Sequence, residues 1–312
     1  MTSKEKTSPG SPPLRIGVAL GGGSARGYAH IGALETLERH AYAPTIVAGI
    51  SFGAVVGALY ASGKSPWELA RAATGQRRRD VIPHIADFGL HAAALFKGDR
   101  LESYFERLLE GRSFADLVKP LVVVATDIDS GERVLLSEGN LARALRASSS
   151  MPGVFAPVEI EGRRLVDGGI CTPLPLAALG GETLDLAIGI GAGTTGETSQ
   201  VIRLTQRMLA TEWGRRVHQG LQSSSRTHPL SRLGRGLAYT ATSCLPQTIC
   251  AESLQVHTNP PISWLGFHRA EHAIRAGEAA LEAFVPSIRQ AAQLRTLGVV
   301  TPDGSEAVQD AA

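Results

Sequence analysis

The sequence predicts an α/β protein in which helices sandwich a mostly parallel sheet. Short apolar runs rich in branched residues, typical of buried strands, alternate with helical segments up to about residue 195. The first two of these strands each lead into a helix through a glycine-rich turn. Apolar strands that alternate with helices are typical of parallel sheets covered on both faces. One large domain accommodates all of these segments.

The strands are expected at residues 14–20, 45–50, 120–128, 163–169 and 184–193, with 132–138 pairing beside 120–128. The helices are expected at residues 27–42, 53–63, 65–73, 98–111, 140–150 and 267–288. Ser65 is predicted to cap the third helix, because Pro66 then occupies the first helical position. Asp99 is predicted to cap the fourth.

The predicted core of the domain spans residues 14–195. Residues 1–13 contain no apolar segment of the kind that a secretory signal needs, so we expect a disordered tail there. Residues 196–297 are expected to form a helical C-terminal part of the same domain, with a mobile loop near 222–238. A polar tail follows at 298–312. The basic amphipathic pattern at 201–221 is typical of a packed surface helix, and also of a helix lying on a membrane.

Composition excludes several classes of function. The chain has 312 residues, 43% of them hydrophobic, and a formal net charge of +2, which does not indicate a nucleic-acid partner. Its three cysteines lack metal-ligand spacing, so we expect no metal site and no disulfide framework. We also expect no cofactor. We expect a cytoplasmic protein with peripheral contact at the inner membrane face as an option. The oligomeric state stays open.

A glycine loop, "LGGGSARG" at 20–27, connects the first strand to the first helix. It matches neither the dinucleotide-binding fingerprint, since Arg26 stands where the last glycine belongs, nor the P-loop, since Tyr28 replaces the lysine. Successive glycines before a helix still form a nest of backbone N–H groups, which binds either a phosphate or the oxyanion of a tetrahedral intermediate. Arg26 would either bind backbone carbonyls within this region or meet an anionic head group.

The motif "GISFG" at 49–53 places Ser51 between a buried strand and a helix. This strand–turn–helix context is the one that a nucleophile elbow requires. Gly49 and Gly53 remove side chains where strand and helix come closest. Because both turns follow parallel strands, we expect the glycine loop and Ser51 at the same carboxyl edge of the sheet.

A serine nucleophile needs a base, and the sequence offers two kinds. Histidine candidates, none in a glycine-rich turn after a strand, are His30, His218, His228, His257, His268 and His272. The acid with the better setting is Asp167 in "LVDGGI", which ends a strand and is followed by Gly168 and Gly169. Asp127 also ends a strand, although "DSGE" after it is typical of a plain turn.

Three ordered motifs resemble the patatin-like phospholipases, especially the bacterial group related to the neuropathy target esterase domain: "GGGSARG", "GISFG" and "DGG" at 167–169. The similarity extends over about residues 14–195, with further likeness in "ATDIDSGE" and "ASSSMPGVFAPVEIEGRRLVDGG". The resemblance implies a three-layer α/β/α fold and a Ser–Asp dyad without histidine. Ser51 would then be the nucleophile and Asp167 the base.

The resemblance also assigns the oxyanion hole to the backbone N–H groups of Gly22, Gly23 and Ser24, with Arg26 and Gly27 supporting the loop. Ser24 stands where the family usually has glycine. A serine at this position keeps the backbone N–H but restricts the backbone conformation. Thr172 stands where many relatives have asparagine, so we expect the turn after Asp167 to be supported differently here.

The expected activity is hydrolysis of a lipid or other acyl ester by a phospholipase, lysophospholipase or carboxylesterase. Two alternatives stay open at this point. One is a histidine-dependent esterase or acyltransferase, and the other is a non-catalytic module that binds a lipid or a phosphate.

Overall fold

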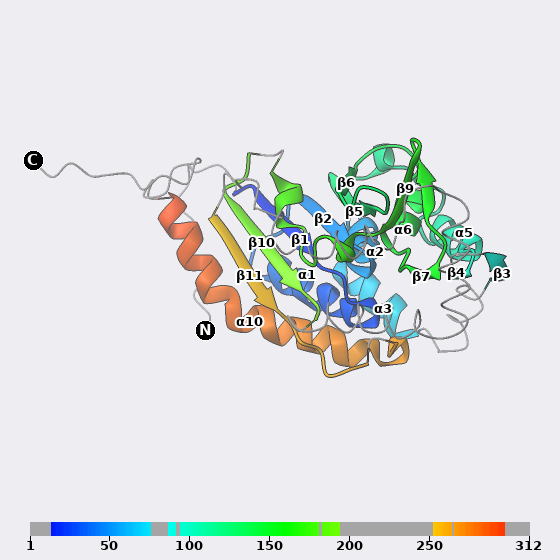
Figure 1. The fold of residues 1–312 in the computed structure, drawn as a ribbon. Coiled ribbons are helices and arrows are strands. Elements are labelled where there is room, and N and C mark those ends of the chain that lie inside the picture. The colour runs from blue at the N-terminus through cyan, green and yellow to red at the C-terminus, as the bar shows by residue number, and fades with distance from the viewer. Residues whose placement is uncertain are drawn as a thin grey trace, which may run out of the picture.

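A mixed sheet of eight strands forms the centre of the part of the chain that the computed structural model describes, residues 14–75, 87–91, 94–180, 183–193, 252–263 and 265–296. The strand order is β11-β10-β1-β2-β5-β9-β8, with β6 paired to β5 (Figure 1). The strands are β1 (Ile16–Leu20), β2 (Ile46–Ile50), β5 (Leu121–Asp127), β6 (Arg133–Leu136), β8 (Val158–Ile160), β9 (Arg163–Asp167), β10 (Leu186–Gly191) and β11 (Glu252–His257).

The five strands β11, β10, β1, β2 and β5 run parallel, whereas β6, β8 and β9 pair antiparallel with their neighbours. Every residue of β1, β2 and β10 is buried. Such strands need cover on both faces, which explains why they are apolar throughout rather than alternating. The predicted α/β class with a mostly parallel sheet is confirmed.

Two strands share one edge of β5. The β2 strand pairs with residues 121–124 and ends at Ile50 opposite Val124. The β9 strand pairs antiparallel with residues 125–127 and ends at Asp167 opposite Ala125. Because β6 pairs with residues 123–126 and overlaps both of them, it occupies the other edge of β5. The carboxyl ends of β2 and β9 therefore meet end to end.

Helices cover one face of the sheet: α1 (Ala29–Arg39), α2 (Phe52–Ala61), α3 (Pro66–Gly75), α5 (Asp99–Leu108), α6 (Leu141–Ser148) and α10 (Ala270–Thr296). Their apolar side chains form one core with Val18, Leu20 and Val47 of the sheet. Alternate strand residues such as Ala19 and Ala48 face the other way and pack on the 3₁₀ segment Leu176–Leu179. This alternation follows from the period of two in a strand.

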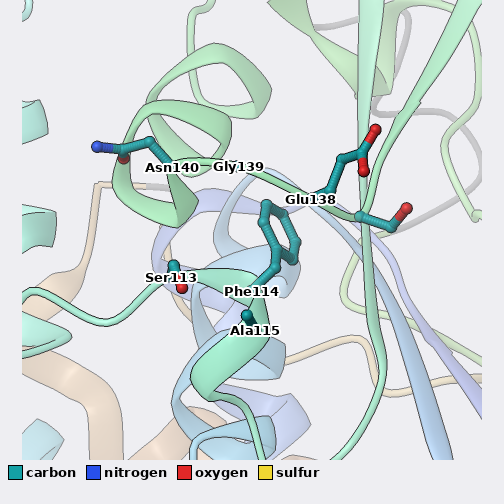
Figure 2. A pocket seen from close by; sticks show the side chains of 7 residues that line it. Ser113, Phe114, Ala115, Glu138, Gly139 and Asn140 are labelled. Carbon is teal, nitrogen blue, oxygen red and sulfur yellow. The ribbon is translucent and has the colours of Figure 1, made fainter.

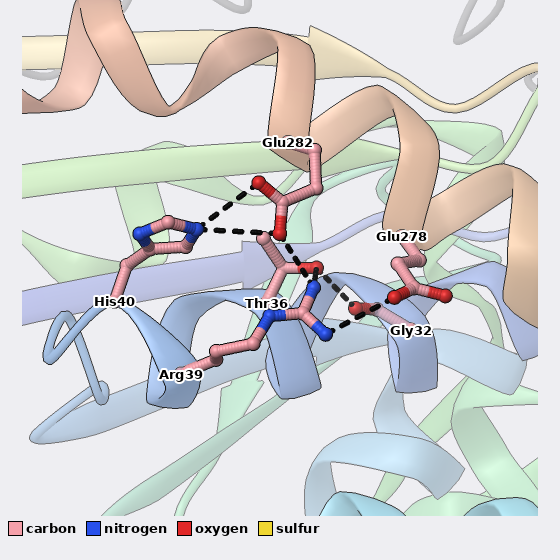
Figure 3. A network of polar contacts seen from close by, with 6 residues as sticks. All are labelled: Gly32, Thr36, Arg39, His40, Glu278 and Glu282. Atoms are coloured by element: carbon pink, nitrogen blue, oxygen red, sulfur yellow. Dashed lines mark hydrogen bonds and ion pairs between the residues drawn. The ribbon is translucent and has the colours of Figure 1, made fainter. Parts of the chain in front are cut away.

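The long C-terminal helix α10 lies along α1 (Figure 1). Side chains are absent where the two backbones touch: a Cβ on Gly32 would overlap the Ile274 carbonyl, and a Cβ on Gly277 would overlap the Ala29 carbonyl. Beside this crossing, Arg39 and His40 of α1 contact Glu278 and Glu282 of α10 (Figure 3). These ion pairs are solvent-exposed and contribute about 0–1 kcal/mol each, so the close backbone packing dominates.

A second, three-stranded sheet combines β3 (Phe88–His91), β4 (Ala94–Phe96) and β7 (Gly153–Phe155). The buried Arg146 of α6 holds it. Its guanidinium donates to the carbonyls of Gly98 and Ala156, at 2.9 and 3.0 Å, and lies over the Phe155 ring. Backbone carbonyls therefore satisfy a charged group that burial would otherwise make costly.

Several local expectations differ from the structure. Asp99 does not cap α5, because the cap position is held by Gly98 at a φ of 87°, which makes Asp99 the first helical residue. The strands β3, β4, β7, β8 and β11 were not predicted, since each is short or lies at a sheet edge. In β11 the signal is a simple alternation in which Leu254 and Val256 point inward. Residues 1–13, the proposed helix at 201–221, the loop near 222–238 and residues 298–312 lie outside the described residues.

We predict that Gly277→Ala lowers the free energy of unfolding by at least about 2 kcal/mol, because the added methyl must force α10 away from Ala29. Gly75→Ala in α3 is the matched control, since no atom of the described residues lies within 4 Å of its Cβ position. That change should be neutral or stabilise by about 0.5 kcal/mol. Urea denaturation of both variants tests this, and equal midpoints would contradict the packing argument.

Candidate active site

Ser51 lies at the sharp turn between β2 and α2, with φ 53° and ψ −126°. A residue other than glycine rarely adopts this backbone conformation. The conformation costs about 1–3 kcal/mol and persists only where surrounding contacts impose it. The contacts are close: a Cβ on Gly49 would lie 2.5 Å from the Ala54 Cα, and one on Gly53 would lie 2.5 Å from the Leu20 carbonyl oxygen. Both glycines of the motif are thus required by the packing of the turn.

Asp167 ends β9 directly opposite this turn. Its carboxylate accepts a hydrogen bond from the Gly169 N–H at 2.8 Å, and the Ser51 hydroxyl lies near enough to lower the pKa of this carboxyl. Burial raises the pKa of this carboxyl from 3.8 to about 6, because the protein withdraws it from water, while the Gly169 N–H and the Ser51 hydroxyl act in the opposite direction. The group is therefore mostly ionised at neutral pH and is more basic than an exposed aspartate.

The turn after Asp167 leaves no room for side chains. A Cβ on Gly168 would overlap the carbonyl oxygen of Val124, and one on Gly169 would lie 3.1 Å from the Asp167 carboxylate. Thr172 is buried, and its N–H donates to the Gly168 carbonyl at 3.0 Å. Thr172 thus supports the turn through its backbone.

The glycine loop begins at the end of β1, beside the end of β2. The Gly21 N–H donates to the Ile190 carbonyl at 2.9 Å, which ties the loop to β10. A Cβ on Gly22 would lie 3.7 Å from the Ser51 Cβ, so this part of the loop lies against the serine. Ser24 has a φ of 51°, a left-handed conformation that favours glycine. The loop therefore does impose a glycine-like backbone where this chain has serine.

His30 supports the same loop through a hydrogen bond to its backbone. It is completely buried in α1, and its Nε2 lies 2.8 Å from the Gly21 carbonyl oxygen, to which it must donate. Burial lowers the pKa of His30 to about 4, so the ring is neutral at physiological pH. Because its donor is committed to Gly21, His30 acts as a support for the loop and is unsuited to be the base for Ser51.

The segment before α10 contacts the glycine loop and the start of α2. The Arg26 Nε donates to the carbonyl of Ile262 at 2.9 Å, which is the backbone-binding option of the two that the sequence left open. Tyr28, Phe52 and Phe267 form a cluster of rings with centroids 4.8–6.2 Å apart. Gly27 allows it, since a Cβ there would lie 2.7 Å from the Phe52 ring.

Other candidate residues lie elsewhere. His257 stands on β11, three strands from β2, which at the usual strand spacing is about 14 Å away. His268 and His272 are exposed near the start of α10, and His218 and His228 lie outside the described residues. Asp127 accepts a hydrogen bond from the Asp129 N–H at 2.9 Å, as in a plain turn. The hollow in Figure 2, lined by residues 113–115 and 137–140, flanks the amino end of β5 rather than the end near Ser51.

Two hydroxyl side chains at the site were missed by the sequence analysis. The Ser51 N–H donates to the Ser148 hydroxyl at 2.8 Å, and the Thr126 hydroxyl donates to the Asp167 carbonyl at 3.0 Å. Both hydroxyl residues are buried. The available signal was the run "ASSSMPG", in which three consecutive polar residues end a helix that faces the core.

A comparison with protein families matches residues 18–179 to the family described as "Patatin-like phospholipase". An uncharacterized NTE family protein of Mycobacterium tuberculosis is 36% identical over 208 residues, which cover 67% of this chain and 57% of the relative. Human patatin-like phospholipase domain-containing protein 6 is 32% identical over 189 residues, covering 57% of this chain and 13% of that protein. The chain thus matches little more than half the length of the mycobacterial relatives.

Among solved structures, VipD from Legionella pneumophila matches with a TM-score of 0.53 and 14% sequence identity, covering 89% of this chain and 67% of VipD. At this identity the match supports the fold alone. Of the helices in the described ranges, none has the length and hydrophobicity to cross a bilayer.

The raised pKa of Asp167 predicts a pH-dependent cost to stability. Its pKa is higher in the folded state than in the unfolded state, so wild type loses about 3 kcal/mol of unfolding free energy from this group as pH rises from about 4 to above 6. Asp167→Asn does not titrate and avoids that loss. The variant should therefore gain stability over wild type as pH rises. Urea denaturation at pH 4 and pH 7.5 measures this, and a pH-independent difference would contradict the assigned pKa.

Proposed function

Because this chain belongs to the patatin-like phospholipase family, we propose that it is a serine acyl hydrolase in which Ser51 is the nucleophile and Asp167 the base. The observation that carries the proposal is the meeting of the Ser51 turn and the buried Asp167 carboxylate where β2 and β9 end against β5, with the Ser51 hydroxyl lowering the pKa of that carboxyl. Covalent catalysis by a serine requires a base beside it whose pKa is shifted toward the working pH.

In the first half-reaction, Ser51 Oγ attacks the carbonyl carbon of an acyl ester while its proton passes to Asp167. The tetrahedral intermediate carries a negative charge on the former carbonyl oxygen. The N–H groups of Gly22, Gly23 and Ser24 are proposed to stabilise that oxyanion, and the start of α2 adds a favourable dipole. Each donor of this kind contributes about 3 kcal/mol in enzymes where it has been removed.

Collapse of the intermediate breaks the ester bond, and the departing alkoxide takes the proton from Asp167. An acyl group then remains on Ser51. Asp167 next accepts a proton from water, which attacks the acyl carbonyl, and the fatty acid leaves as Ser51 regains a proton.

The proposed substrate class is a lipid or a simpler acyl ester, as the family name implies. Phospholipid, lysophospholipid and carboxylic ester all present the same reacting carbonyl, and the described residues do not distinguish among them. Contact with a membrane surface would bring the chain to such a substrate.

The proposal is tested by labelling with a fluorophosphonate, which reacts covalently with activated serines, followed by intact-mass measurement. Wild type should gain a single adduct, and Ser51→Ala should gain none. Asp167→Asn should react at least about 100-fold more slowly, because the base is lost while the shape is kept.

Absence of an adduct on folded wild type would contradict the proposal and favour a non-catalytic binding module. Normal labelling of Asp167→Asn would instead show that the base lies elsewhere, and His218 and His228 would then be the next residues to replace.

The labelling rate should depend on pH through Asp167. The rate is expected to be constant above about pH 7, to reach half its maximum near pH 6, and to fall about tenfold per unit below that. The measurement is the second-order labelling rate between pH 4.5 and 8.5 at two temperatures. A carboxyl midpoint barely moves with temperature, whereas an imidazole midpoint falls on warming, so a shifting midpoint would contradict the assignment.

A further inference from the structure

The C-terminal turn of α6 contacts both members of the proposed catalytic pair. The Ser148 hydroxyl accepts the Ser51 N–H at 2.8 Å and donates to the Val124 carbonyl at 2.7 Å. Two residues further on, the Ser150 carbonyl accepts the Asp167 N–H at 2.9 Å. Ser148 and Ser150 are both 0% exposed. One short turn thus binds the backbone of the nucleophile and of its base.

Ser148 occupies the junction where β2 stops pairing with β5 and β9 starts. Ile50, the last residue of β2 to pair with β5, lies opposite Val124. Asp167 of β9 lies opposite the next residue of β5, Ala125. The turn at Ser51 takes its N–H out of the strand ladder, and Ser148 supplies the acceptor. The same hydroxyl satisfies the Val124 carbonyl. The Ser148 hydroxyl therefore binds both the Ser51 N–H and the Val124 carbonyl at the junction of the two strands.

The turn that carries Ser148 is itself held rigidly. The Ser150 hydroxyl donates to the Arg146 carbonyl at 2.6 Å and accepts a hydrogen bond from the Arg146 guanidinium. That guanidinium also binds the Gly98 and Ala156 carbonyls, so α6 is fixed to the smaller sheet. The acceptor offered to Ser51 thus belongs to a fixed part of the fold.

We propose that Ser148 is a positioning residue for the Ser51 nucleophile: its buried hydroxyl, anchored on Val124, holds the Ser51 amide so that the strained turn directs the serine hydroxyl at Asp167. This inference rests on the proposed function, since it gives Ser148 a role in the same reaction. Ser148 touches no reacting atom and acts through the backbone of Ser51.

The test compares Ser148→Ala, which removes the hydroxyl, with Ser148→Cys, which keeps nearly the same shape but provides a poor acceptor. Ser148→Thr retains the hydroxyl and serves as the rescue. Thr36→Val is the matched control, because Thr36 is equally buried and its hydroxyl donates to a carbonyl at 3.0 Å, yet it lies within α1. Each variant is checked for folding before kinetics are measured.

We expect the fluorophosphonate labelling rate and the kcat for a p-nitrophenyl ester to fall about 100-fold in S148A and S148C, as for other small misplacements of a nucleophile. KM should change by no more than about twofold, because substrate contacts are intact. S148T should recover most of the rate, and T36V should match wild type. A second readout follows the Ser51 amide by hydrogen–deuterium exchange, which should be faster in S148A and S148C.

Labelling of S148A and S148C at the wild-type rate, or an equal loss in T36V, would overturn the positioning role. Unchanged exchange at Ser51 would overturn the hydrogen bond on which that role rests. These outcomes differ from failure of the proposed function, in which wild type itself gains no adduct and Ser148 has no nucleophile to position.

Discussion

The meeting of β2 and β9 along one edge of β5 is the constraint from which the site follows. A strand edge accepts one partner at each position, so β9 can pair with β5 only beyond the point where β2 leaves it. The residues at the two ends, Ser51 and Asp167, are thereby brought into contact although 116 positions separate them in the sequence. The geometry of the pair is set by backbone pairing rather than by flexible side chains.

This arrangement has an energetic cost. Ser51 takes a left-handed backbone conformation, and Asp167 keeps a carboxylate away from water, which raises its pKa. Both features lower stability, as strained and buried groups at functional sites commonly do. Close packing offsets the cost, most clearly at Gly53 and Gly168, where any side chain would collide with the backbone of a neighbouring strand. The strand junction therefore requires glycine at these two positions.

Sequence analysis succeeded where local chemistry decides the structure. Apolar runs identified four of the five parallel strands, all except β11, and glycines identified the turns after β1 and β2. The family resemblance, which the comparisons confirm, rests on the same short motifs. Ser51 and Asp167 were identifiable as candidates because each lies in a glycine-bordered turn directly after a strand.

The remaining features depend on tertiary contacts that no local pattern encodes. His30 gives no sign in the sequence that its ring binds Gly21, and Ser148 is one of three consecutive serines with no mark of its partner. The β11 strand follows a long interval after β10, so its alternation alone did not identify it. The helix α10 was predicted, but its close contact with α1 depends on Gly32, which lies against the Ile274 backbone, and on Gly277, which lies against the Ala29 backbone.

We propose that this strand junction directs Ser51 at Asp167 and places the glycine loop over the developing oxyanion. A crystal structure of the fluorophosphonate adduct would test this arrangement. We expect phosphorus bonded to Ser51 Oγ, with the phosphonyl oxygen within hydrogen-bond distance of the N–H groups of Gly22, Gly23 and Ser24. An adduct on another residue, or a phosphonyl oxygen directed away from this loop, would contradict it.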